Sequence, residues 1–191
     1  MSTTLLDWES RYRTGQTGWQ RSDVNPTCRA WIADGTLPPG HILVPGAGRS
    51  EEPLALAQAG YAVTVVDIAD SAVAFQSERL APLGGIALAA DLFAFTPETP
   101  FDAVYEQTCL CALPPELWDR YAACLAAWIR PGGVLGAMFI QTGRDGGPPF
   151  HCDLGRMGAL FPADLWAWPA DPQPVPQFGG LSEIPAALRR Y

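Results

Sequence analysis

The sequence contains no lysine: its 12 basic residues are all arginines, and 20 acidic residues bring the net charge to −8. A protein that binds DNA or RNA needs a basic surface to replace the counterions of the phosphates. Apart from Arg189-Arg190 the sequence has no basic cluster. We therefore expect a small molecule as the partner, and no nucleic acid.

Long apolar runs are also missing. Stretches such as residues 132–140 are too short to cross a bilayer, which takes roughly 20 residues. Asp7 and Glu9 stand near the start of the chain, where a signal peptide has a basic region followed by an apolar one. We expect a cytoplasmic protein without a membrane partner.

Cysteines are few. Five is an odd number, and the chain of 191 residues is large enough to fold without disulfides. Cys109-x-Cys111 has neither the spacing of a zinc knuckle nor that of a redox pair. We predict thiols that are mostly buried, and no metal site.

The composition, with 48% hydrophobic and 17% charged residues, is that of a globular domain. From about residue 41, short apolar runs alternate with helix-like stretches, which is typical of a parallel sheet covered on both faces. The pattern predicts strands at residues 41–44, 61–68, 86–90, 101–107 and 134–140, and helices at residues 51–59, 70–80 and 114–129. Residues 130–133 are expected to form the turn into the last of these strands. We expect a single domain, residues 1–191, with a doubly wound α/β core at residues 41–191.

The two ends of the chain are less regular. Residues 7–31 carry three tryptophans. We expect helices there that fold over the open end of the sheet, so that residues 1–35 form a helical lid. After the fifth strand, residues 153–160 indicate a short helix, and residues 170–180 are too rich in proline for an interior strand. Closing strands are expected near Leu165 and Ser182.

Gly46-Ala47-Gly48 follows the first predicted strand. Open α/β sheets bind ligands beyond the carboxyl ends of their strands, where glycines let the backbone approach the ligand. Tight turns use glycine as well, so these glycines alone decide little. Asp67 ends the second strand, where an acid can accept hydrogen bonds from both hydroxyls of a ribose, and Asp91-Leu92 follows the third strand, where an adenine would lie.

Two nucleotide cofactors fit such a site. A dinucleotide places its pyrophosphate on the helix N-terminus and needs a third glycine, where this chain has Glu51 followed by Glu52. Two carboxylates at that helix start would repel a diphosphate. S-adenosylmethionine has no phosphate and carries a sulfonium and an ammonium. The charge therefore favours S-adenosylmethionine, with S-adenosylhomocysteine as its product, over NAD.

Several short motifs accompany this site along the chain. They are Trp8-Glu9-Ser10-Arg11-Tyr12-Arg13-Thr14-Gly15-Gln16-Thr17-Gly18-Trp19, Val44-Pro45-Gly46-x-Gly48, Val66-Asp67-Ile68, Asp91-Leu92-Phe93, Phe101-Asp102-x-Val104-Tyr105-Glu106-Gln107-Thr108-x-Leu110-Cys111-Ala112-Leu113, Arg130-Pro131-Gly132-Gly133 and Asp145-Gly146-Gly147-Pro148-Pro149-Phe150. Together they resemble the thiopurine methyltransferase family, and most of all its plant and bacterial thiol and thiocyanate methyltransferases. The first and last motifs are the specific ones, since many methyltransferases share the others.

The resemblance implies a seven-stranded, Rossmann-like class I methyltransferase fold. It implies methyl transfer to a small sulfur nucleophile such as a thiol, hydrosulfide, thiocyanate or thiopurine, or to a selenium compound or halide. It also implies that seven residues contact the cofactor, namely Trp8, Trp19, Gly46, Asp67, Asp91, Leu92 and Gln107. We expect Gly48 and Ile68, which lie next to these residues in the sequence, to contact it as well. Tyr12 stands where relatives often have another tryptophan and keeps an aromatic face there. The tail after Phe161 departs from the family pattern.

Methyl transfer is an in-line displacement in which a sulfonium and an electron-rich acceptor lose charge together, so positioning outranks acid–base work. Trp8, Tyr12 and Trp19 can hold the sulfonium by cation–π attraction of roughly 0.5–2 kcal/mol each and close over the site. The alternative is that these rings only anchor the N-terminal helix in the core.

A thiol attacks as its thiolate, which calls for a nearby base or positive charge, whereas thiocyanate and halides arrive ionised. The candidates for such a base are Glu106, Asp145 and His151. The candidates for contact with the acceptor are Tyr12, Arg144, Asp145 and Phe150. Cys109 and Cys111 are expected to pack, because methyl transfer needs no enzyme nucleophile.

Two other functions remain open from the residues alone. One is an NAD-dependent oxidoreductase on the same sheet, which the missing third glycine disfavours. The other is a catalytically silent nucleoside-binding module, which has no need of an aromatic lid.

Overall fold

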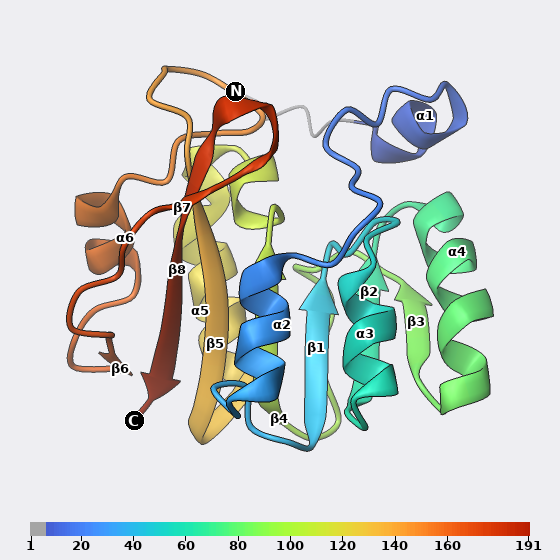
Figure 1. Ribbon diagram of the computed structural model, residues 1–191, viewed down its shortest axis with the longest axis horizontal. Coiled ribbons are helices and arrows are strands. Elements are labelled where there is room, and N and C mark those ends of the chain that lie inside the picture. The colour runs from blue at the N-terminus through green and yellow to red at the C-terminus, as the bar shows by residue number, and fades with distance from the viewer. Residues whose placement is uncertain (1–6) are drawn as a thin grey trace.

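Eight strands form one sheet in the computed structural model, which describes residues 7–191 (Figure 1). Seven of them follow the order β3-β2-β1-β4-β5-β8-β6, and β7 pairs with β8. Pairing is parallel from β3 to β5 and antiparallel around β8. This order confirms the predicted doubly wound, mostly parallel sheet and adds the two-residue β7 to the seven strands expected.

Most elements lie within one or two residues of the predicted positions. The strands are β1 (His41–Pro45), β2 (Ala62–Asp67), β3 (Ile86–Ala89), β4 (Phe101–Gln107), β5 (Ile129–Gln141), β6 (Trp166–Ala167), β7 (Val175–Pro176) and β8 (Ser182–Arg190). The helices are α1 (Trp8–Arg13), α2 (Pro26–Ala33), α3 (Glu52–Gln58), α4 (Asp70–Leu80), α5 (Trp118–Trp128) and α6 (Leu154–Leu160). The 3₁₀ turns are η1 (Ala81–Leu83), η2 (Leu110–Ala112), η3 (Pro115–Leu117) and η4 (Phe178–Gly180).

Two predicted boundaries were wrong. The helix expected from residue 114 begins as η3, and α5 follows it. Strand β5 starts at Ile129 rather than at residue 134, because Ile129 pairs with Phe101 before the register shifts. Arg130-Pro131-Gly132-Gly133 therefore lies in a bulge within the strand rather than in a turn before it.

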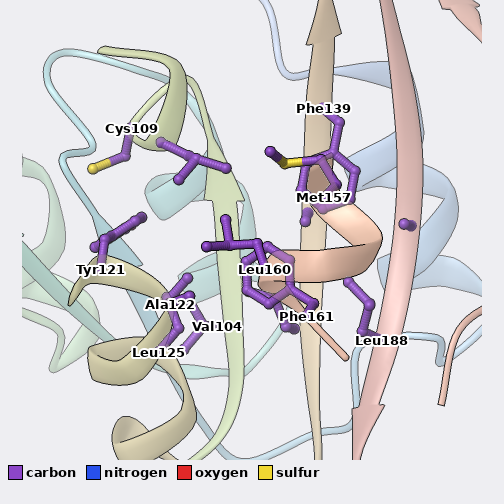
Figure 2. Close-up of a cluster of buried hydrophobic side chains, with 14 of the residues drawn as sticks. Val104, Cys109, Tyr121, Ala122, Leu125, Phe139, Met157, Leu160, Phe161 and Leu188 are labelled. Carbon is purple, nitrogen blue, oxygen red and sulfur yellow. The ribbon is translucent and has the colours of Figure 1, made fainter. Parts of the chain in front are cut away.

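Helices cover both faces of the sheet, with α2, α3 and α4 on one face and α5 and α6 on the other (Figure 1). Side chains alternate along a strand, so Leu43 packs on the α5 side and Val44 on the α3 side. Figure 2 shows the α5 side, where Phe139 of β5 lies beside Met157 and Phe161. Each such buried side chain contributes roughly 1.5–3 kcal/mol, which makes the sheet a rigid base for the loops at its strand ends.

The two N-terminal helices differ in position. α1 lies beyond the carboxyl ends of the strands, next to α4 (Figure 1). α2 packs on a face of the sheet, where the ring of Trp31 lies 6.4 Å from that of Tyr105. A Cβ added to Gly136 of β5 would lie 3.0 Å from the same Trp31 ring. Within residues 7–35, the expectation of a lid over the open end was therefore wrong for α2, and α1 alone lies where a lid would be. Residues 1–6 of the predicted lid lie outside the described residues.

Within residues 7–191, none of the helices combines the length and the apolarity that crossing a bilayer requires. All five cysteines are free, and only Cys124 is partly exposed. This confirms the prediction of mostly buried thiols.

Candidate active site

A cavity of about 600 Å³ lies at the carboxyl ends of the parallel strands. Its wall is formed by the loop after β1, the ends of β2 and β4, the turn after β3, and α1 with the chain that follows it. The cavity brings together every residue predicted to contact the cofactor: Trp8, Tyr12, Trp19, Gly46, Gly48, Asp67, Ile68, Asp91, Leu92 and Gln107.

The loop after β1 requires its glycines for two reasons. Gly46 and Gly48 have φ of 56° and 55°, in the left-handed region that residues with a side chain rarely adopt. A Cβ on Gly46 would lie 2.7 Å from Sγ of Cys109, and one on Gly48 would collide with Oη of Tyr12. The loop thus presents bare backbone to the cavity.

Asp67 ties this glycine loop to the start of α4. One carboxylate oxygen accepts a hydrogen bond from the N–H of Gly48 at 2.8 Å, and the other accepts one from the N–H of Ala69 at 2.9 Å. The residue is 6% exposed, and burial raises the pKa of its carboxyl against the opposing effect of these hydrogen bonds. Each carboxylate oxygen keeps a second lone pair, so Asp67 can also accept hydrogen bonds from a ribose.

Three aromatic rings of the N-terminal segment form an edge-to-face cluster on the cavity wall. The ring of Trp19 lies 5.4 Å from that of Trp8 and 5.9 Å from that of Tyr12. The guanidinium of Arg11 lies 5.8 Å from the centres of both tryptophan rings, and that of Arg49 lies 5.0 Å from the centre of the Tyr12 ring. These faces accommodate cations, which is the property needed to hold a sulfonium.

Contrary to the prediction, Glu51 and Glu52 do not present two free carboxylates at the start of α3. Arg79 binds the Glu51 carboxylate through both terminal nitrogens of its guanidinium. Glu52 is buried and accepts a hydrogen bond from the N–H of Asn25 at 2.7 Å. Because Arg79 neutralises Glu51, this helix start repels a diphosphate less than expected. Glu51 still disfavours a dinucleotide sterically, because it stands where a dinucleotide site needs glycine.

A buried polar cluster below Gln107 was not predicted. Glu183 of β8 accepts hydrogen bonds from Nε2 of Gln107, at 3.2 Å to each oxygen, and from Nδ2 of Asn25 at 3.1 Å. The hydroxyl of Tyr105 donates to Oε1 of Gln107 at 2.8 Å. Asn25 and Glu183 lie 158 residues apart and belong to none of the motifs noted above, so no local sequence signal could have linked them.

The turn after β4 brings strained backbone and two thiols to the cavity wall. Thr108 has φ of 65° and is the only non-glycine residue between residues 7 and 191 with a positive φ; such strain tends to occur at functional sites. Cys109 and Cys111 also line the cavity, and burial raises the pKa of both thiols well above its usual value. They are therefore protonated at neutral pH, which fits the expected packing role.

The predicted bases lie off the cavity wall. Glu106 is buried, with its Oε1 accepting a hydrogen bond from the N–H of Leu110 at 2.6 Å, and burial raises its pKa to about 7. Asp145, Phe150 and His151 line a neighbouring hollow, which shares Arg144 with the cavity. Of the predicted acceptor contacts, the cavity thus brings together Tyr12 and Arg144, and the hollow contains Asp145 and Phe150.

Comparison with known proteins identifies this arrangement. The family model described as thiopurine S-methyltransferase (TPMT) matches residues 3–167. The chain belongs to the thiopurine S-methyltransferase family. It is 33% identical to the thiopurine S-methyltransferase of Azotobacter vinelandii, over 82% of this chain and 81% of the relative. It is 30% identical to probable thiol methyltransferase 2 of Arabidopsis thaliana, over 78% of this chain and 68% of the relative.

The fold is that of S-adenosylmethionine-dependent methyltransferases. The 1,6-didemethyltoxoflavin-N1-methyltransferase of Burkholderia thailandensis, solved with 1,6-didemethyltoxoflavin and S-adenosylhomocysteine, superposes with a TM-score of 0.75 at 21% identity, covering 96% of this chain and 85% of that one. Membership of the thiopurine S-methyltransferase family confirms the predicted enzyme class, an S-methyltransferase that uses S-adenosylmethionine. It gives no support to the NAD-dependent oxidoreductase.

Proposed function

We propose that this methyltransferase moves the methyl group of S-adenosylmethionine to a small sulfur nucleophile, namely a thiol, hydrosulfide, thiocyanate or thiopurine. Selenium compounds and halides are further acceptors of the same chemical kind. One observation carries the proposal: the glycine loop, Asp67 and the aromatic cluster line the same cavity, and the chain belongs to this family. Two relatives are named as thiol and thiopurine methyltransferases.

The residues on the cavity wall fit the parts of the cofactor. Asp67 offers carboxylate lone pairs to the ribose hydroxyls. Ile68 and Leu92 offer apolar surface to the adenine, and Ile68 is 54% exposed. Nε of Arg49 is buried and has no hydrogen-bond partner within residues 7–191. A buried donor without a partner costs roughly 1–3 kcal/mol, so this group suits the carboxylate of the methionine portion.

The chain itself contributes to the reaction by holding the cofactor, aligning the acceptor with the methyl group and shielding both from water. When bound, S-adenosylmethionine supplies the methyl group on a positively charged sulfur. Trp8, Tyr12 and Trp19 line the cavity, where their rings would face that positive charge and would help to exclude water from the displacement. The remaining wall has to place an electron-rich acceptor in line with the methyl group.

Arginines supply the positive charge that a sulfur acceptor needs. Arg11, Arg21 and Arg144 also line the cavity, and within residues 7–191 none of them forms an ion pair. Nearby positive charge lowers the pKa of a thiol and attracts acceptors that are already anions. Asp145 and His151, in the hollow beside Arg144, remain the candidates for taking up the thiol proton. Buried Glu106 is a weaker candidate, since it lines neither the cavity nor the hollow.

Isothermal titration calorimetry with S-adenosylhomocysteine and with NAD tests the cofactor side of the proposal. We expect S-adenosylhomocysteine to bind at one site per chain and NAD to give no heat of binding. Tight NAD binding would overturn the proposal. Binding of S-adenosylhomocysteine without methyl transfer to any acceptor would instead identify the catalytically silent module.

The partner we propose is a small-molecule acceptor, with neither nucleic acid nor membrane involved. The five free cysteines fit the reducing environment of the cytoplasm.

A further inference from the structure

Glu183 is the least exposed charged side chain around the cavity, at 1% of its surface, and it lies behind the wall rather than on it. It stands at the start of β8, next to the carboxyl end of β5. Burial raises the pKa of its carboxyl, while hydrogen bonds from the side chains of Gln177, Gln107 and Asn25 and the charge of Arg21 act against that rise. Amide donors thus converge on one buried carboxyl group.

The partners of Glu183 fix which end of each amide faces it. Asn25 uses its Oδ1 to accept the hydrogen bond of the Thr27 N–H at 2.8 Å, which caps α2, so its Nδ2 is the end available to Glu183. Gln107 uses its Oε1 to accept the Tyr105 hydroxyl, so its Nε2 faces Glu183. A carboxylate only accepts hydrogen bonds, and it therefore excludes the flipped orientation of both amides.

The fixed orientation determines what Gln107 can offer to a ligand. Both oxygens of Glu183 lie within reach of its Nε2, while its Oε1 has accepted one hydrogen bond and retains a second lone pair. Gln107 lines the cavity. At the end of β4 the wall therefore presents an acceptor, backed by a buried acidic group.

We propose that Glu183 is a positioning residue, which holds Gln107 so that its carbonyl oxygen receives the ammonium of the methionine portion of the cofactor. This inference rests on the proposed function of the same cavity. The substitution Glu183→Gln would place an N–H₂ group among amide donors. Gln107 would then be free to turn its amide over and present a donor where the ammonium needs an acceptor.

The test compares two ligands by calorimetry. S-Adenosylhomocysteine carries the ammonium, and 5′-methylthioadenosine carries the nucleoside and sulfur but no amino acid portion. We expect Glu183→Gln to lower the affinity for S-adenosylhomocysteine about tenfold, which corresponds to the loss of one hydrogen bond to a charged group. The affinity for 5′-methylthioadenosine should not change. Glu98→Gln removes the same charge from an exposed position and is the matched control.

A second variant guards against a simple folding defect. Gln107→Met removes the amide itself, so it should lower the affinity for S-adenosylhomocysteine to a similar extent. The affinity for 5′-methylthioadenosine should again not change. The double variant should lose no more than either single variant, because both act on one contact. Equal weakening of both ligands by Glu183→Gln, no weakening of either, or additive losses in the double variant would overturn the inference. Failure of the wild-type chain to bind S-adenosylhomocysteine would overturn the proposed function instead.

Discussion

Glu9 of α1 caps helix α4 at Ser71, 62 residues later in the chain. Its carboxylate accepts hydrogen bonds from the N–H of Ser71 at 2.8 Å and from its hydroxyl at 2.6 Å, and these bonds hold the pKa of Glu9 below its usual value. The N-cap residue of α4 itself is Ala69, whose side chain cannot cap. Docking of α1 therefore also completes the helix that follows Asp67.

Glu9→Ala should loosen α1 and weaken cofactor binding together. Losing the cap frays the first turn of α4, so we expect the melting temperature to fall by about 2–4 °C and the affinity for S-adenosylhomocysteine to fall several-fold. Thermal denaturation and calorimetry measure the two effects. Glu78→Ala, at an exposed position of α4, removes the same charge and should change neither. If Glu9→Ala behaves like this control, α1 does not depend on the cap.

Asp67→Asn should lower the affinity for S-adenosylhomocysteine about tenfold. The amide has one oxygen that accepts hydrogen bonds, whereas the carboxylate has two. Asp67→Ala should weaken it further, since the N–H groups of Gly48 and Ala69 then lose their acceptor as well. Asp70→Asn, an exposed neighbour, is the control for charge. Calorimetry gives the affinities, and an unchanged affinity in Asp67→Ala would place the ribose elsewhere.

Gly48→Ala should cost more stability than its backbone conformation alone explains. At Gly84, where φ is 77° and a Cβ meets nothing within 4 Å, alanine should cost about 1 kcal/mol. At Gly48 the Cβ also collides with Oη of Tyr12. Adding Tyr12→Phe should therefore recover part of the excess in urea denaturation. Equal losses at the two glycines would show that Tyr12 does not pack against the loop.

Glu106 should make the protein less stable as the pH rises through neutrality. Burial raises its pKa from 4.5 to about 7. Between these values the folded chain holds a proton that the unfolded chain has lost, so this residue contributes a loss of up to about 1.4 kcal/mol per pH unit as the pH rises.

Glu106→Gln keeps an oxygen for the N–H of Leu110 but does not titrate. The stability of this variant relative to wild type should therefore increase from pH 5 to pH 8 and then level off, as measured by urea denaturation. The exposed Glu98→Gln should show no such trend. A constant difference between Glu106→Gln and wild type would mean that the buried carboxyl keeps an ordinary pKa.

The parts of the site that could be predicted follow strands directly in the sequence. Gly46, Gly48 and Asp67 end apolar, β-branched runs, and parallel strands bring their carboxyl ends to one edge of the sheet. Sequence order alone therefore placed these residues together. The family motifs added the aromatic residues of the N-terminal segment.

The parts that could not be predicted depend on partners that only folding brings together. Neither the cap of Glu9 on Ser71 nor the pairing of Arg79 with Glu51 has a local signature, because each links separate elements. The turn signal at residues 130–133 was misassigned because proline and glycine favour a bulge as readily as a turn.

The most direct test of the account is to measure which acceptors the purified chain methylates with S-adenosylmethionine. Headspace gas chromatography would detect volatile products from hydrosulfide, small thiols, thiocyanate, iodide and selenium compounds, and mass spectrometry would detect methylated thiopurines. We predict methyl transfer to at least one sulfur acceptor, with the rate reduced in Asp67→Ala. Methyl transfer to an oxygen or nitrogen acceptor while no sulfur, selenium or halide acceptor reacts would contradict the account.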